Sequence, residues 1–372
     1  MKKMIKMSLV AAVAVAGLTT TSSAANLEDA IKGTKLTGYV RYRINTDHEN
    51  STDMSEEGKV VAKITTPVND MVTANVKTVS FAATEKGQTK ANTDVTEANF
   101  VVKAAGATVI AGLQTSQSPF LANNGDTRSH GVTALVPAGP VTVAAAYYTT
   151  TVGGGLTKPA MTNDITALGA IGTFGAVNVQ AWYASVEDGA DVENSTIVDA
   201  ATTAAVTVGL VDASAMNLTL GAKLGAVNVD AMMTQVTNAD VDTGVTKLVV
   251  SGTAGNISYA AGYAMSQKDG GMVSLDQDSD AVSDLSMHVL NMAATTDASA
   301  FYLMGKVKMD NGVCASLAHL SGSSDAHADF DETDVKVGYT MSKNFKASLI
   351  YGMGDNAGTD FATSRIEVKY TF

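Results

Sequence analysis

The chain has 372 residues, 45% of them hydrophobic, with 37 acidic against 25 basic residues. This balance argues against nucleic acid as a partner, because binding the phosphate backbone requires a concentrated positive surface. The single cysteine, Cys314, excludes an internal disulfide, so stability must come from hydrogen bonding and packing. Proline is scarce (5) and glycine plentiful (33), which favours long hydrogen-bonded strands punctuated by turns.

The N-terminal 24 residues have the pattern of a secretory signal peptide. Three lysines precede an apolar run over residues 9–18, and small residues stand at Ser22 and Ala24. This pattern predicts cleavage before Ala25, and the apolar run is too short to span a bilayer as a helix. Without the three lysines, the mature chain has 22 basic and 37 acidic residues, a net charge of −15 that favours cations over anions.

Residues 25–33 predict a short N-terminal segment ahead of the first strand. Asn26 is suited to cap a helical turn that ends at Gly33, and coil is the alternative.

The first predicted strand alternates between two faces. An apolar set faces a polar and cationic set, in the order Leu36, Gly38, Val40, Tyr42, Ile44 against Thr37, Tyr39, Arg41, Arg43, Asn45. The same period of two recurs over residues 59–65 and 99–104. The apolar face is often Ala, Val or Gly, while charged residues stand in mid-strand. A membrane barrel accounts for both features, because apolar side chains meet lipid and charged ones point into a wet lumen.

This alternation predicts five basic residues that line a pore: Arg41, Arg43, Lys63, Lys77 and Lys103. Basic residues on one wall of a pore, set against acids on a constriction loop, create a transverse field. The alternative is that these charges are paired among themselves.

Short turns alternate along the chain with long polar segments. The long segments lie near residues 47–57, 82–94, 116–129, 152–163, 187–201, 237–243, 267–283, 321–332 and 354–362. Outer-membrane barrels have this asymmetry of short periplasmic turns and long extracellular loops. The prediction is an all-β, transmembrane antiparallel β-barrel over residues 34–372, with about eighteen strands. Extra candidate runs near residues 202–211 and 284–294 leave sixteen to twenty strands open.

The third long segment, 116–129, is expected to be the constriction loop by its place in the order. The predicted constriction residues are Pro119, Phe120, Asp126 and Arg128, with Asp126 as the field-forming acid and Arg128 as its counterweight. Solvated loop charges are the alternative.

Two acidic clusters fit loose calcium coordination, with a hydrated surface loop as the alternative. The first is Asp276, Asp278 and Asp280, which does not form an EF-hand because Ala281 and Met287 stand where glycine and glutamate are needed. The second consists of Asp325, His327, Asp329, Asp331 and Glu332. No motif requires a cofactor.

Enzyme signatures are missing from the sequence. It contains no zinc-protease, nucleophile-elbow, Walker A or dinucleotide pattern. Ser129 and His130 are adjacent, so in a strand they point to opposite faces and do not form a nucleophile–base pair. We therefore predict a protein that is not an enzyme.

The last predicted strand ends in Tyr370-Thr371-Phe372, after an alternation that puts Ile366 and Val368 on the face of both aromatic residues. A terminal Phe with an aromatic residue two positions earlier is the ending of most bacterial outer-membrane barrels. By resemblance to that class, Tyr370 and Phe372 form the signal read by the barrel-assembly machinery. Physically, both rings are expected in the interfacial aromatic girdle.

The export signal is followed by several segments with a familiar sequence: Leu27–Lys32, Gly38–Arg43, Gly112–Thr115, Pro119-Phe120, Thr127-Arg128 and Val141–Tyr147. In these segments the chain resembles the Campylobacter-type major outer membrane porins. The resemblance implies an eighteen-stranded, trimeric, cation-preferring barrel with an inward-folded third loop, and calcium binding in some members. The expected role is passive diffusion of ions and small hydrophilic solutes across the outer membrane. A substrate-specific channel and a barrel-anchored surface adhesin are the alternatives.

Overall fold

The computed structural model describes residues 32–49, 54–85, 88–115, 118–120, 128–152, 160–161, 164–187, 195–198, 205–208, 213–238, 241–270, 287–290, 295–326 and 328–372. The predicted signal peptide lies outside the described residues. So does most of the predicted N-terminal segment, of which Lys32 and Gly33 are helical. No helix among the described residues is long and apolar enough to cross a membrane.

The strands are β1 (Lys35–Asp47), β2 (Met54–Pro67), β3 (Val72–Glu85), β4 (Gln88–Ala104), β5 (Ala107–Gln114), β6 (Arg128–Ala138), β7 (Val141–Val152), β8 (Ala160–Met161), β9 (Asp164–Phe174), β10 (Val177–Glu187), β11 (Ser195–Val198), β12 (Ala205–Val208), β13 (Ser214–Leu224), β14 (Val227–Asn238), β15 (Val241–Ala254), β16 (Ile257–Ser266), β17 (Ala298–Lys308), β18 (Val313–Ser324), β19 (Phe330–Thr340), β20 (Phe345–Asn356) and β21 (Asp360–Thr371).

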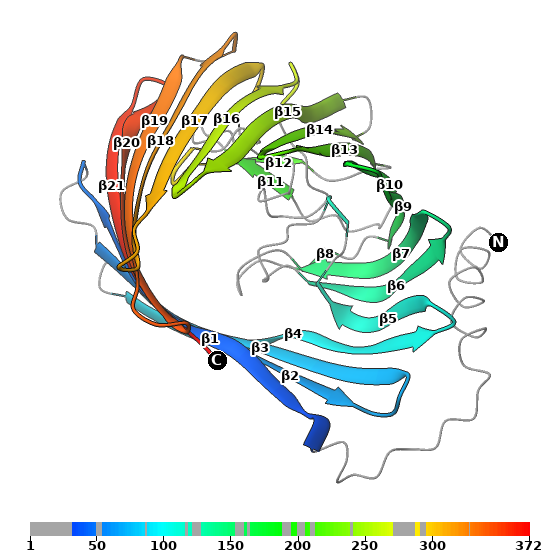
Figure 1. The fold of residues 1–372 in the computed structure, drawn as a ribbon. Coiled ribbons are helices and arrows are strands. Elements are labelled where there is room, and N and C mark those ends of the chain that lie inside the picture. The colour runs from blue at the N-terminus through cyan, green and yellow to red at the C-terminus, as the bar shows by residue number, and fades with distance from the viewer. Residues whose placement is uncertain are drawn as a thin grey trace.

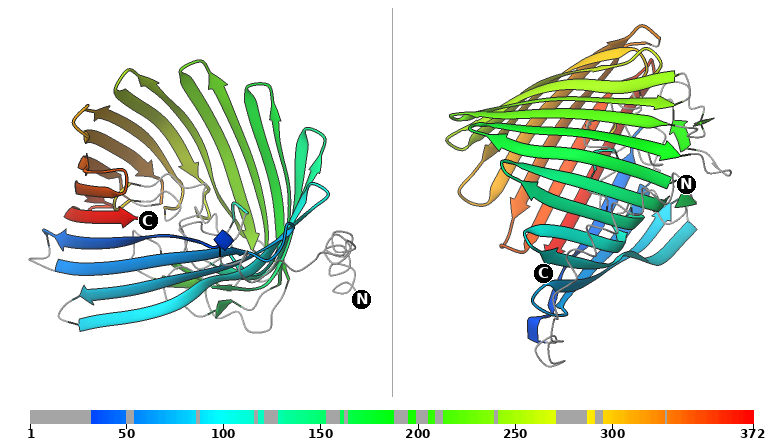
Figure 2. Two further views of the ribbon diagram at one scale, coloured as in Figure 1. Left: turned by 60° about the horizontal axis from the view of Figure 1, so that its bottom comes forward. Right: turned by 90° about the vertical axis from the view of Figure 1, so that its right-hand side faces the viewer.

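Eighteen of these strands form one closed antiparallel barrel within the described part of the chain (Figure 1). Neighbours in the barrel follow the chain order, and β1 pairs with β21 to close the ring. The two-residue β8 adds a short pairing to β7, and β11 with β12 forms a separate hairpin. Figure 2 shows the strands side by side and tilted along the wall. The predicted transmembrane β-barrel is confirmed, with eighteen strands rather than sixteen or twenty.

The two extra candidate runs are not barrel strands where the structure describes them. Residues 205–208 form β12 in the separate hairpin, and residues 287–290 contain no strand.

Alternation of side chains gives the barrel wall two different faces. On β1, Val40 and Tyr42 point outward and are 45% and 41% exposed, whereas the intervening Arg41 side chain is 13% exposed. On β4, Phe100 points outward and its neighbour Asn99 is buried inside. The outer face is therefore apolar, as the bilayer requires, while the hydrogen-bonded ring satisfies the backbone.

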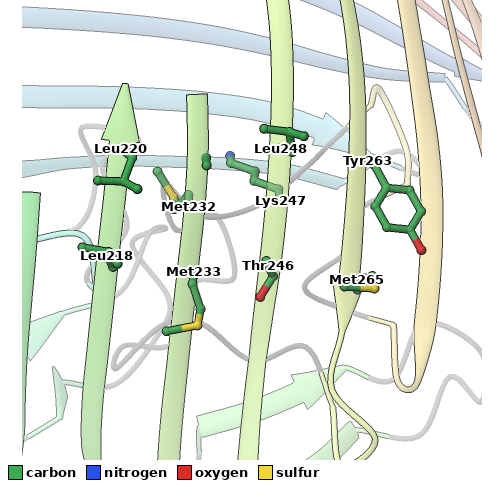
Figure 3. A pocket seen from close by; sticks show the side chains of 10 residues that line it. Leu218, Leu220, Met232, Met233, Thr246, Lys247, Leu248, Tyr263 and Met265 are labelled. Atoms are coloured by element: carbon green, nitrogen blue, oxygen red, sulfur yellow. The ribbon is translucent and has the colours of Figure 1, made fainter. Parts of the chain in front are cut away.

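The outer face is drawn at close range over β13 to β16 (Figure 3). The side chains that line a shallow apolar groove there come mostly from alternate positions: Leu218, Leu220, Ala231, Met233, Thr246, Leu248, Tyr263 and Met265. This groove is part of the lipid-facing surface.

Connections at one end of the barrel are tight turns, as predicted. Gly175 and Gly225 have φ of 65° and 66°, a left-handed conformation that favours glycine. Both turns have the same sequence, Gly-Ala-Val-Asn-Val, over residues 175–179 and 225–229. At the other end, two of the segments expected to be long loops are mostly strand. β3 and β4 leave only residues 86–87 between them, and β14 and β15 leave only 239–240. Strand pairing continues through the polar residues of these stretches.

Candidate functional site: the inner wall of the barrel

The predicted pore-lining residues lie on inward-facing positions of β1 to β4. Arg41 and Arg43 belong to β1, Lys63 lies on β2 directly opposite Lys77 of β3, and Lys103 lies near the end of β4. Their outward-facing neighbours are apolar, so the wall carries its charge inside. The structure thus brings these residues together on one quarter of the barrel, and their role in a pore stays a prediction.

Each arginine of β1 is paired with a carboxylate from a neighbouring strand. Arg41 forms an ion pair with Glu57 of β2. The Nε of Arg43 donates to Oε2 of Glu367 on β21, at 2.5 Å. Lys369 of β21 lies 4.1 Å from the ring centroid of Tyr39, a cation–π contact. These contacts hold the guanidinium groups against the wall, so they do not extend freely into the lumen.

One carboxylate bridges the two opposed lysines. Lys63 Nζ donates to Oε2 of Glu97 at 2.6 Å, and Lys77 Nζ lies 3.7 Å from Oε1 of the same side chain. Deeper in the wall, Asn75 donates to Asn99, which in turn donates to the carbonyl of Leu113. Thr65 Oγ1 of β2 donates to Asn75 at 2.9 Å, so these side chains form a second polar chain from β2 to β5 beside the lysine–glutamate bridge.

The predicted constriction residues are divided among three places. Arg128 is the first residue of β6, not part of the loop, and forms an ion pair with Asp94 of β4. Asp126 lies outside the described residues. Pro119 is partly buried, and Phe120 is fully buried.

Phe120 lies inside the barrel. It belongs to a hydrophobic cluster whose other buried members include inward-facing residues of β7, β9, β10, β13 and β14: Ala144, Ala146, Tyr148, Ile165, Ala167, Trp182, Ala184, Val186, Ala215 and Val236. The inner wall therefore differs by sector, with charge on β1 to β4 and an apolar surface on β7 to β14.

The acidic clusters do not form the predicted loop sites where they are described. Asp331 and Glu332 lie in β19, so they point to opposite faces and only Glu332 is inside. His327 and the whole first cluster (Asp276, Asp278, Asp280) lie outside the described residues. Within the described ranges, no group of three or more His, Cys, Asp or Glu side chains is placed to hold a metal ion.

The C-terminal residue closes the barrel. The amide of Gly38 donates to the carbonyl of Phe372 at 2.9 Å, and the Phe372 amide donates back to Gly38 at 3.0 Å. The Tyr370 and Phe372 rings are 6.3 Å apart between centroids on the outer face. A Cβ at position 38 would lie 3.1 Å from the Phe372 ring and 2.0 Å from the Val61 carbonyl oxygen, so this glycine permits the close approach.

Sequence reasoning missed the acidic partners of the basic residues. Glu57, Asp94 and Glu97 stand at inward-facing positions of β2 and β4. The signal was present, because an acid at an inward position of a neighbouring strand is a candidate partner. Choosing among the acids, however, requires the register between strands.

Comparison with known proteins agrees with this geometry. Residues 1–148 match the family model described as Campylobacter major outer membrane protein. No curated protein sequence matches the chain.

Similar solved structures include three Pseudomonas aeruginosa proteins. OccK2 (OpdF) has a TM-score of 0.71 at 11% identity, and covers 92% of this chain and 98% of its own. OccK5 (OpdH) has a TM-score of 0.70 at 12% identity, with coverage of 92% and 98%. OccK1 (OpdK) has a TM-score of 0.70 at 12% identity, with coverage of 92% and 99%.

These structures share the fold of the chain, while the family match extends over its N-terminal part and agrees with the resemblance seen in the sequence. The described part of the chain thus forms a closed antiparallel β-barrel of eighteen strands, and residues 1–148 are similar to the Campylobacter major outer membrane protein family.

Proposed function

We propose that the protein forms a water-filled channel for passive diffusion of ions and small hydrophilic solutes. The observation that carries this proposal is the inner wall of β1 to β4, where charged side chains stand in mid-strand. Burying unhydrated charge inside a barrel costs far more than hydrating it, so such a wall favours a wet lumen.

A constriction formed by the third loop is part of the proposal. Its support is Phe120, which is fully buried against inward-facing residues of the apolar sector. A loop anchored at Phe120 reduces the cross-section of the lumen beside the charged sector. Asp126 and Arg128 are proposed to contribute to a transverse field across it.

A preference for cations is proposed from the charge distribution. Arg41, Arg43 and Lys63 each have an acidic partner, so much of the positive charge on this wall is compensated. The net charge of −15 on the mature chain then favours cations near the protein.

Two assembly proposals rest on resemblance alone: a homotrimer, and insertion through the barrel-assembly machinery with Tyr370 and Phe372 as the signal. Calcium binding is proposed at Asp276, Asp278 and Asp280, because clustered carboxylates suit this hard cation. Calcium is tested by titration calorimetry of the folded protein with CaCl₂ after chelation. Loss of heat in the triple Asp→Asn variant is the expected result, and equal heat in that variant would exclude the site.

Conductance of the purified mature protein in a planar bilayer, with the reversal potential under a KCl gradient, tests the channel. Large, steady, ohmic steps with a cation-favouring reversal potential are expected. Silent bilayers from a folded, heat-modifiable barrel would instead favour the adhesin. Saturable block of the current by one class of solute would favour a substrate-specific channel.

A further inference from the structure

A second segment, residues 287–290 between β16 and β17, lies inside the barrel. Leu290 is 6% exposed and belongs to a hydrophobic cluster of inward-facing residues from five successive strands: Val245, Ala264, Ala300, Leu320 and Phe330. Met287 packs against the same cluster. The segment therefore packs on the β15–β19 sector, which adjoins the β7–β14 sector that holds Phe120.

Two carboxylates of β19 bind the backbone of this segment. The amide of Leu290 donates to Oε2 of Glu332 at 2.6 Å, and the amide of Val289 donates to Oε1 and Oε2 at 2.9 and 3.1 Å. The amide of His288 donates to Oδ2 of Asp334 at 3.1 Å. Three consecutive amides therefore donate to two side chains of one strand.

These hydrogen bonds lie in a site that largely excludes water, where each is electrostatically stronger than it would be in solvent. Glu332 is fully buried and Asp334 is 8% exposed. Three cations, Arg43, Lys336 and Arg365, lie near enough to act electrostatically on His288 of the segment. The two buried carboxyl groups of β19 thus hold the segment in place.

Gly352 of β20 leaves room for the two carboxylates. It lies beside Asp334 in the ladder. A Cβ at position 352 would lie 2.6 Å from Oδ1 of Asp334, 3.2 Å from Oε1 of Glu332 and 3.3 Å from Cδ2 of His288. A side chain larger than hydrogen would therefore displace the groups that hold the segment.

We propose that Glu332 and Asp334 are positioning residues that clamp residues 287–290 to β19, and that the clamped segment narrows the lumen and sets its size limit for solutes. Any backbone held inside the ring reduces the cross-section open to water. This proposal rests on the proposed channel function and adds a second narrowing element to the third loop.

Single-channel conductance and exclusion of neutral polyethylene glycols test the clamp. Glu332→Ala removes the acceptor of three hydrogen bonds, and Gly352→Ala disturbs both carboxylates without removing either. Both variants are expected to raise the conductance by roughly twofold and to admit larger polymers. Glu332→Gln keeps one acceptor oxygen, so a smaller increase is expected.

Gly305→Ala is the matched control, because it makes the same substitution in β17 at a position where a Cβ meets nothing within 4 Å. Wild-type conductance is expected for it.

The proposal is overturned if Gly352→Ala and Glu332→Gln form heat-modifiable barrels with the conductance and exclusion limit of the wild type. If Glu332→Ala does not fold, these two milder variants decide. Silence of the wild-type protein is a different result, because it removes the channel function itself. A graded increase from Gln to Ala at position 332 supports the clamp over a general loss of structure.

Discussion

At the scale of single residues, Glu97 contacts two cations of the inner wall. It accepts from Lys63 and lies beside Lys77, two cations placed directly opposite each other in the β2–β3 ladder. Like charges directly opposed in a ladder destabilise it. One carboxylate on β4 therefore compensates two ammonium groups on two other strands.

Replacing Glu97 by Gln is expected to destabilise the barrel by about 1–2 kcal/mol, because the two ammonium groups lose their counterion in a partly screened site. The midpoint of urea unfolding in detergent measures this. The double variant Glu97→Gln/Lys77→Met removes the repulsion as well, so most of the stability should return. Equal losses in both variants would contradict the bridging role.

The single tryptophan, Trp182, reports on the apolar sector. A Cβ at Gly169 of β9 would lie 2.5 Å from two ring atoms of Trp182, its partner in the ladder. Gly169→Ala is expected to cost about 1–3 kcal/mol by overpacking and to change the tryptophan emission. Gly305→Ala, in open space, should leave both unchanged, and an unaltered emission in Gly169→Ala would argue against the contact.

At the scale of elements, the strands were more predictable than the contacts between them. The period of two over residues 36–45 placed Arg41 and Arg43 correctly on the inner face, because alternation fixes the face whatever the strand packs against. The partner of Arg43 was not predictable in this way. Glu367 is 324 residues away, and only closure of the ring brings the two together.

The amino-acid composition around Glu332 led to a wrong prediction. A stretch with several acids and a histidine was interpreted as a loop, yet residues from Phe330 onward form β19. Inside the barrel the backbone amides of residues 289 and 290 donate to this acid, and no local sequence pattern contains that information.

His288, in the 287–290 segment, is expected to make the stability of the barrel depend on pH. Burial, with Arg365, Arg43 and Lys336 adding to it, lowers the pKa of His288 from 6.5 to about 4. Between these two pKa values the unfolded chain binds a proton that the folded barrel does not, so stability decreases as the pH falls. Above this range His288 is neutral in both states and does not make stability depend on pH. Wild type is expected to lose more stability than His288→Gln between about pH 7 and pH 5, measured by urea unfolding. Equal losses would show that His288 is not the group responsible.

At the scale of the whole molecule, the barrel depends on the pairing of its two end strands. Phe372 exchanges two backbone hydrogen bonds with Gly38, and β1 pairs with β21 over nine residue pairs from Tyr39↔Thr371 to Asp47↔Thr363. Deleting Phe372 removes the last rung of this seam and one ring of the outer aromatic pair.

Deletion of Phe372 is therefore expected to reduce the fraction of chains that reach the heat-modifiable form in refolding into detergent or lipid, while strand content by circular dichroism in the folded fraction stays the same. Phe372→Tyr keeps the rung and an aromatic ring, and is expected to fold like the wild type. Full yield after the deletion would contradict a role for this residue in closure.

The closed seam also has a kinetic consequence. Since the first and last strands are neighbours, their pairing has the greatest sequence separation of any in the ladder, and such non-local contacts form slowly. Until they form, an almost complete sheet exposes two unpaired edges, each a template for another chain. The most aggregation-prone species on the folding path is thus the one closest to completion. A factor that shields these two edges late in assembly would raise the yield more than one that acts on the unfolded chain.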